Sequence, residues 1–328
     1  MISRRRLLAT SAATLAPAII VRAQAQPQPP AQPWPNRFVR LIVPLAPGGP
    51  TDVAARVMAE PLSRMWGQQV VIENRPGGGT NIAGELVARS PPDGHTILYA
   101  TASLAVAPSL YRTLGYDPLT DLAPVANLFT FPYYMFVPNS SPARTVQEFI
   151  AYAKANPGKL TMASPGTGSA PHLAIELFQT MAGLKMTHVP YRGAGPVLND
   201  LIPGRVDVYI ASGSLLENVR AGQIRGLGVS ALTRDPAAPD LPPIAEAVPG
   251  YEVMSWQALF VAARTPPEIV KTMNAAALAA LTDPMVKAKA DLIGYAPAGS
   301  TPDELAAMLK AEVAKWAAVI KSAGLKIN

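Results

Sequence analysis

The clearest hydrophobic pattern in the chain lies near its N-terminus, over residues 40–60. Residues 41–43 form a short apolar run that predicts a buried strand. Two glycines follow in a turn over residues 44–50, and the apolar positions after it recur at helical spacing. Thr51 or Asp52 is a suitable N-cap for that helix. The pattern therefore predicts a strand, a glycine loop and a helix in succession.

The same order of elements recurs along the chain. Predicted strands at residues 69–73 and 96–99 are separated by a second glycine loop, residues 74–80, and a helix. Further on, a short strand at 160–163 leads into a third glycine loop, residues 164–169, and another helix. Alternating strands and helices favour parallel sheets with helices on both faces. Ligands of such folds bind beyond the carboxyl ends of the strands.

Two long apolar runs, at residues 131–137 and 254–262, bracket the second group of elements. If both cross between lobes, the first lobe is discontinuous and comprises residues 36–135 and 258–328. The second lobe is then 136–257. Two α/β lobes joined by two strands make a hinged clamshell, with the ligand in the cleft between them.

The first glycine loop has the features of an anion site. Backbone N–H groups at a helix N-terminus have no intrahelical partner, and the helix dipole favours negative charge there. The loop contains neither Gly-x-x-x-x-Gly-Lys nor Gly-x-Gly-x-x-Gly, the patterns of nucleotide phosphate sites. A carboxylate is therefore the expected anion. The alternative is that the glycines only make a tight turn, and the local pattern does not separate the two.

The N-terminus predicts export. Three arginines at positions 4–6 precede two leucines and a modestly apolar stretch that ends in an A-x-A cleavage site at Ala25. The arginines are typical of a twin-arginine signal, and the alternative is a Sec signal that happens to carry them. We expect residues 1–25 to be a signal peptide, 26–35 to be a flexible N-terminus, and the mature protein to be periplasmic.

Composition narrows the partners. The pI is near 9.5, but residues 1–26 hold four arginines and no acid, and without them 24 basic and 22 acidic residues remain. No Lys/Arg-rich run with interleaved aromatics remains either, so we expect no nucleic-acid partner. The chain has no cysteine, which excludes disulfides, thiolate metal sites and cysteine nucleophiles.

Signatures of enzymes are missing. The Gly-x-Ser-x-Gly elbow of serine hydrolases does not occur, and the carboxylates are too scattered to suggest an acid/base pair. The three histidines lack metal-ligand spacing. We expect His95 to be solvated in a turn, His188 to be structural, and His172 either to bond a ligand carboxylate or to cap and pack. The sequence predicts no enzyme, no metal and no cofactor.

Six motifs resemble those of one known family, in the usual order and spacing. They are IVPLAPGGPTD at 42–52, ENRPGGGTNI at 73–82, PDGHTIL at 92–98, GTGSAPHLA at 166–174, HVPYRG at 188–193 and LIPGRVD at 201–207. Over about residues 36–328 the chain resembles the Bug family, the substrate-binding proteins of tripartite tricarboxylate transporters. The resemblance implies a type II periplasmic binding fold, with two α/β lobes, two crossover strands and a ligand clamped between the lobes.

The resemblance also implies a way of binding. Members typically bind small organic acids and anchor one carboxylate by backbone N–H groups and hydroxyls rather than by an arginine. Members often have an aromatic residue where this chain has Leu45, which makes that wall smaller and less able to stack. By position, the ligand-binding residues are Leu45, Ala46, Gly48, Gly49, Thr51, Asp52, Thr101, Ser103, Ser164, Gly166, Thr167, Gly168, Ser169, His172, Tyr191 and Asp207.

Three functions follow as hypotheses. The first is a periplasmic solute-binding protein that captures a small organic acid and delivers it to membrane permease subunits. The acid is a mono-, di- or tricarboxylate, an acidic amino acid or an aromatic acid. The second is a ligand sensor whose closed form docks on a sensor kinase. The third is an exported enzyme, against which the missing catalytic groups argue. The family norm is a monomer.

Overall fold

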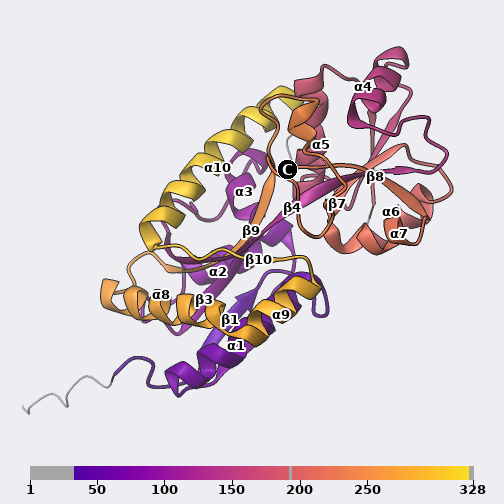
Figure 1. The fold of residues 1–328 in the computed structure, drawn as a ribbon. Coiled ribbons are helices and arrows are strands. Elements are labelled where there is room, and N and C mark those ends of the chain that lie inside the picture. The colour runs from indigo at the N-terminus through magenta and orange to yellow at the C-terminus, as the bar shows by residue number, and fades with distance from the viewer. Residues whose placement is uncertain (1–32, 192–193, 325–328) are drawn as a thin grey trace, which may run out of the picture. The chain divides into compact units, whose positions relative to one another are not determined.

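The computed structural model describes residues 33–191 and 194–324. The predicted signal peptide, residues 1–25, lies outside the described residues, as does most of the stretch 26–35. Residues from Trp34 onward form one packed unit of strands and helices (Figure 1). No helix in the described part of the chain is both long and apolar enough to cross a membrane.

Within the described residues the strands form one ten-stranded sheet. Its order is β2–β1–β3–β9–β4–β7–β5–β6, and β8 and β10 pair with β4 off this path. The strands are β1 (Val39–Val43), β2 (Val70–Asn74), β3 (Thr96–Thr101), β4 (Leu122–Pro138), β5 (Thr161–Ser164), β6 (Thr187–Pro190), β7 (Val208–Ser212), β8 (Ile224–Val229), β9 (Met254–Ala262) and β10 (Ala296–Pro297).

Parallel pairing is confined to the two flanks of this sheet. β1 is parallel to β2 and β3, and β5 is parallel to β6 and β7. β9 and β4 lie between the flanks and pair antiparallel with each other and with their neighbours. The two predicted α/β lobes are therefore each built on parallel strands, and two antiparallel strands join them.

β4 passes from one group of strands to the other. Its residues 122–132 pair with β9, and its residues 133–138 pair with β7 and β8. The strand predicted at 131–137 is thus the second part of a strand of 17 residues. The predicted lobe boundaries, after residues 135 and 257, fall inside β4 and β9, and the exact boundaries stay a prediction.

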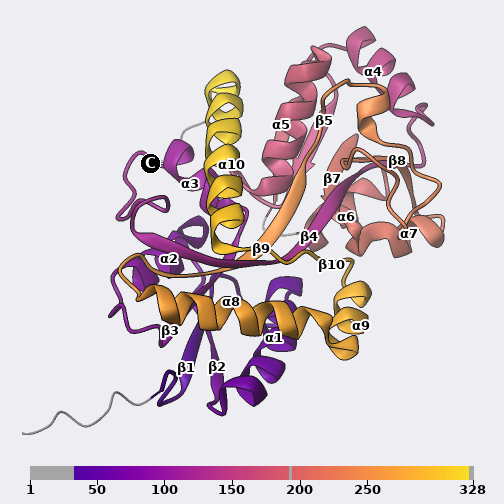
Figure 2. The same cartoon turned by 60° about the vertical axis from the view of Figure 1, so that its left-hand side comes forward.

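The helices cover the two groups of strands. In Figures 1 and 2, α1, α2, α8 and α9 lie around β1–β3, and α4 to α7 surround β5–β8. α10 packs against both α3 and α5. The helices are α1 (Pro50–Trp66), α2 (Asn81–Ala88), α3 (Ser103–Leu110), α4 (Val146–Ala155), α5 (Ala170–Ala182), α6 (Ala194–Leu201), α7 (Leu216–Arg220), α8 (Pro267–Thr282), α9 (Pro284–Leu292) and α10 (Pro302–Ala323). Three 3-10 turns are η1 (Gly78–Thr80), η2 (Gly213–Leu215) and η3 (Ile244–Glu246).

α1 begins slightly earlier than predicted. Gly49 is its N-cap and Pro50 its first residue, a position that suits proline because the missing N–H needs no partner there. Thr51 and Asp52, predicted as alternative N-caps, lie buried in the first turn instead. That N-cap prediction is wrong, because the proline sets the start of the helix.

Trp34 and His95 both depart from the sequence prediction. Trp34, placed within the flexible N-terminus, packs edge-on against Trp66 with ring centroids 5.2 Å apart. His95, predicted to be solvated, is 5% exposed, and its ring centroid lies 6.0 Å from that of Trp34. The prediction for His95 is wrong because Trp34 packs over the turn that carries it.

Candidate functional site

A cavity of about 580 Å³ lies where helix starts from both groups of elements meet. Pro50 and Thr51 line it from the start of α1, and Ser103 lines it from the start of α3. Ser169 and Ala170 line it from the start of α5. We call this space the main cavity.

The main cavity favours an anion without offering a charged side chain. α1 and α5, of 17 and 13 residues, both begin at it. The first N–H groups of a helix lack intrahelical partners, and its dipole is positive at that end. Among the described residues that line the cavity there is no Lys, Arg, His, Asp or Glu. Helix ends and hydroxyl groups therefore supply its attraction for negative charge.

The crossover strands supply a wall that the sequence analysis missed. Phe131 and Tyr133 of β4 line the main cavity, as do Ser255 and Gln257 of β9. Tyr295 stacks on Phe131 with ring centroids 4.1 Å apart and 2° between the ring planes. A stacked aromatic pair thus lines the same cavity as the helix starts.

Gln257 ties this wall to the start of α1. It is buried, and its Oε1 accepts a hydrogen bond from the Tyr99 hydroxyl at 2.6 Å. Its Nε2 donates to Thr51 Oγ1 and to the Tyr295 hydroxyl, both at 3.1 Å. Burial raises the pKa of Tyr295 to about 12, so that hydroxyl stays neutral. A buried amide with both ends satisfied makes this part of the cavity rigid.

Asp52 holds the first glycine loop. Its carboxylate accepts the Gly48 N–H at 3.0 Å, two bonds from Arg56 at 2.9 and 3.1 Å, and one from the Asn74 amide at 2.9 Å. Burial by itself would raise the pKa of Asp52, but the bonds from Arg56, Gly48 and Asn74 outweigh it and lower the pKa to about 2. The Gly48 N–H is therefore committed to a charged side chain of the protein.

His172 holds the loop before α5 in the same way. The imidazole is fully buried, and its Nδ1 accepts the Gly168 N–H at 3.0 Å. An Nδ1 that accepts a hydrogen bond carries no proton. Ser169 Oγ donates to the Gly166 carbonyl at 2.7 Å, which closes the loop on itself.

His188 supports this loop from behind. Its ring stacks on that of His172, with centroids 3.8 Å apart and 19° between the planes. Its Nε2 lies 2.7 Å from Ser164 Oγ. Burial, together with the neighbouring His172, lowers the pKa of His188 to about 4, so the ring is neutral at pH 7. These contacts fit the structural role predicted for His188.

Two more of the predicted site residues bond to other parts of the protein. The Tyr191 hydroxyl donates to Asp200 at 2.8 Å, and burial together with this bond raises the pKa of Tyr191 to about 12. The Asp207 carboxylate accepts the Thr161 N–H at 2.7 Å and the Thr161 hydroxyl at 2.8 Å. Both side chains therefore stabilise the second lobe in this structure.

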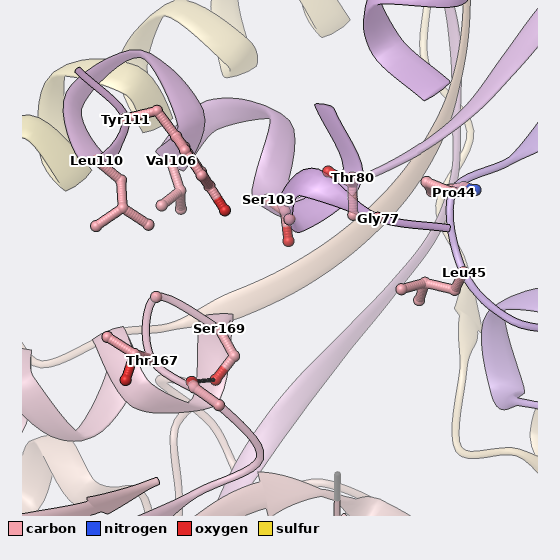
Figure 3. A pocket seen from close by; sticks show the side chains of 13 residues that line it. Pro44, Leu45, Gly77, Thr80, Ser103, Val106, Leu110, Tyr111, Thr167 and Ser169 are labelled. Atoms are coloured by element: carbon pink, nitrogen blue, oxygen red, sulfur yellow. Dashed lines mark hydrogen bonds between the residues drawn. The ribbon is translucent and has the colours of Figure 1, made fainter. Parts of the chain in front are cut away.

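The structure brings together about half of the predicted site. A second cavity, of about 260 Å³, is drawn in Figure 3 and shares lining residues with the main one. Predicted residues that line one or both are Leu45, Thr51, Thr101, Ser103, Gly166, Thr167, Gly168 and Ser169. Those that line neither are Ala46, Gly48, Gly49, Asp52, Ser164, His172, Tyr191 and Asp207. As direct ligand contacts, both sets stay a prediction.

Some of the missed residues carry a usable sequence signal. Ser212 is the last residue of β7 and Ser214 follows two residues later, and both line the main cavity. The end of a strand is a place where small hydroxyl residues suggest a site. Phe131 and Tyr133 carry none, because an apolar strand has the same pattern whether it faces a core or a cavity. Over residues 33–191 and 194–324, no group of three His, Asp or Glu is placed to hold a metal ion.

Comparison with known proteins identifies the fold and the family. The family model "Tripartite tricarboxylate transporter family receptor" matches residues 54–325. The solved structure of R. palustris Rpa4515 with adipate is 40% identical, covers 90% of this chain and 100% of that one, and has a TM-score of 0.80. The periplasmic binding protein BugD is 33% identical, with 90% and 100% coverage and a TM-score of 0.77. MatC (Rpa3494) from Rhodopseudomonas palustris with bound malate is 32% identical, with 88% and 100% coverage and a TM-score of 0.74.

These similarities confirm the predicted clamshell of two α/β lobes joined by crossover strands. They also confirm the family predicted from the six motifs, and that family consists of substrate-binding receptors rather than enzymes. The chain therefore belongs to the Bug family, the receptors of tripartite tricarboxylate transporters.

Proposed function

We propose that this protein is a periplasmic receptor that captures a small organic acid in the main cavity and delivers it to a permease of the tripartite tricarboxylate type. One observation carries the proposal: the N-termini of α1 and α5 converge on a cavity lined by hydroxyl groups. The adipate and malate bound by two relatives support a carboxylate as the ligand.

The carboxylate is held by neutral groups in this proposal. Thr51 and Ser103 offer hydroxyls to the cavity at the starts of α1 and α3, and Ser169 brings the start of α5 to it. Thr101 and Leu45 complete the surface around them. Asp52 and His172 act indirectly, by fixing the glycine loops. A carboxylate that enters the cavity loses its hydration shell, but helix ends and hydroxyl groups already in position replace those hydrogen bonds. An arginine is therefore not required.

The support for delivery to a permease comes from the family description and not from the cavity. A receptor of this kind closes when the ligand contacts both lobes, and closure changes the surface that a membrane partner meets. No feature of the residues that the structure describes favours a sensor kinase as the partner instead.

The experiment is a binding screen of the mature protein from Gln26. Calorimetry and thermal shift against adipate, malate, short monocarboxylates, acidic amino acids and aromatic acids should yield at least one ligand. Its matching amide should not bind. A ligand at about 100 times its Kd adds about 2.7 kcal/mol to stability. A folded, ligand-free protein that binds none of these acids would contradict the proposal.

Ser169→Ala and Thr145→Ala form a matched pair for locating the site. Both side chains cap a helix, of α5 and α4 respectively, by accepting a backbone N–H. Loss of either cap should cost about 1 kcal/mol of stability. Only Ser169 lines the cavities, so only Ser169→Ala should also weaken acid binding. Equal affinities in the two variants would place the site elsewhere.

A further inference from the structure

The cavity of about 260 Å³ is a side compartment of the main cavity. The two share four lining residues, Leu45, Thr80, Ser103 and Ser169. Figure 3 shows Leu45 pointing into this space, with Ser103 on one side and Ser169 on the other. A ligand anchored in the main cavity can therefore extend into the side compartment.

The side compartment is built for an uncharged group. Val106, Leu110 and Tyr111 of the α3 segment line it together with Leu45, and its described lining includes no acid or base. The helix starts at Ser103 and Ser169 lie at the junction that the two cavities share. Leu110 and Tyr111, which line the side compartment alone, lie at the C-terminal end of α3, and that end of a helix carries a partial negative charge. A second carboxylate placed there would meet a negative dipole and no cation, and burying an unpaired charge is costly.

Thr80 stands at the junction of the two cavities in an unfavourable conformation. Its φ is 83°, and among the described residues it is the sole non-glycine with a positive φ. Such a conformation is rare for a β-branched residue. The preceding glycines have positive φ as well, and a Cβ on Gly79 would lie 1.9 Å from the Tyr111 hydroxyl oxygen. The loop is thus pressed against the wall of the side compartment, and strain of this kind gathers at functional sites.

We propose that the side compartment takes an uncharged, apolar end of the bound acid, and that Thr80 is a specificity-determining residue at its entrance. The inference rests on the proposed function and narrows it. The preferred ligand is then an acid with one carboxylate in the main cavity and an apolar tail that reaches toward Tyr111.

Hexanoate and adipate form a matched pair of probes. They share a six-carbon chain, and adipate carries a second carboxylate where hexanoate has a methyl group. Calorimetry on the mature protein should show hexanoate binding about tenfold or more tightly than adipate, the effect of an unpaired charge in an apolar compartment. Propanoate is too short to reach the compartment and serves as the reference ligand.

Tyr111→Lys tests the compartment by placing a cation at its end. This variant should reverse the preference, so that adipate binds more tightly than hexanoate. Tyr152→Lys, a partly buried tyrosine of α4 that lines neither cavity, is the matched control and should keep the original preference. If Tyr111→Lys does not fold, Tyr111→Phe replaces it and should tighten hexanoate relative to adipate.

Thr80→Gly tests the entrance. Without the Thr80 side chain the compartment opens wider to water, and the ratio of hexanoate to adipate affinity should fall at least about fivefold toward unity, a change of about 1 kcal/mol. An unchanged ratio would remove Thr80 from the proposal.

The outcomes separate the two levels of inference. If no acid of the binding screen binds, the proposed function fails. If other acids of the screen bind but hexanoate does not, the apolar side compartment is overturned. If propanoate binds and wild-type protein takes adipate as tightly as hexanoate, the main cavity keeps its role and the apolar side compartment is overturned. An unaltered preference in folded Tyr111→Lys overturns it as well.

Discussion

Asp52 and His172 make the same hydrogen bond in the two lobes: each accepts the backbone N–H of the glycine four residues before it. The distances are 3.0 Å from Gly48 N to Asp52 Oδ2 and 3.0 Å from Gly168 N to His172 Nδ1. Each acceptor is the third residue of its helix. The two glycine loops beside the main cavity are thus fixed by the helices that follow them.

Replacing Asp52 by alanine should destabilise the protein strongly. The change leaves the Gly48 N–H, the Asn74 amide and the Arg56 guanidinium without their common acceptor. We expect a loss of about 2–4 kcal/mol in the free energy of unfolding. Leaving several donors without their buried acceptor costs more than the net contribution of the hydrogen bonds to stability. Urea denaturation at pH 7 measures it.

Asp303→Ala is the matched control for this change. Asp303 also lies in the first turn of a long helix, α10, but its side chain is exposed. Its replacement should cost no more than about 0.5 kcal/mol. Equal losses for Asp52 and Asp303 would show that the Gly48 bond is not a brace.

Stability should depend on pH through His188. Its pKa is lowered from 6.5 to about 4 by burial and by His172, while Glu176 opposes that shift. The unfolded chain therefore binds a proton at His188 before the folded chain does. Stability is complete above about pH 6.5 and falls as the pH drops toward 4, at no more than about 1.4 kcal/mol per pH unit and less because the ring is half-buried.

Urea denaturation at pH 7, 5.5 and 4.5 measures this dependence, and His188→Gln should flatten it. The titration of Asp52 does not contribute to this dependence, because its pKa of about 2 and its ordinary value of 3.8 both lie below the measured pH values. The stability that Asp52 supplies is lost only as the pH falls from about 3.8 toward 2. Identical pH profiles for wild type and His188→Gln would assign the dependence to other groups.

The loops beside the cavity could be predicted from the sequence, and the wall between them could not. Glycine turns followed by helices leave a local pattern, which predicted the strand–loop–helix units around Thr51 and Ser169. Gln257 bonds to Tyr99, 158 residues earlier, and to Thr51, 206 residues earlier. No local pattern records such pairs, because they depend on how the crossover strands return. The same holds for Tyr295, which stacks on Phe131.

Trp34→Ala should destabilise the protein, although Trp34 lies at the edge of the packed unit. Its ring packs against Trp66 and His95, at 5.2 and 6.0 Å between centroids, and it is partly buried. Truncating a fully buried tryptophan costs about 3–5 kcal/mol, so we expect about 2 kcal/mol here. Urea denaturation checks it, and Trp34→Phe should recover much of the loss. No effect from either change would mean that this stacking does not contribute to stability.

Thr80→Gly should raise the stability of the ligand-free protein while it weakens discrimination between ligands. At a φ of 83° the Thr80 side chain strains the backbone, and glycine adopts this conformation without that penalty. We expect a gain of about 1 kcal/mol, which for a chain of this size raises Tm by roughly 1.5 °C. Thr120→Gly, at an exposed turn residue without a positive φ, should lose stability instead, because glycine gains freedom in the unfolded chain. If both glycine variants lose stability equally, the backbone at Thr80 is not strained, and the position of Thr80 at the junction of the cavities does not reduce folding stability.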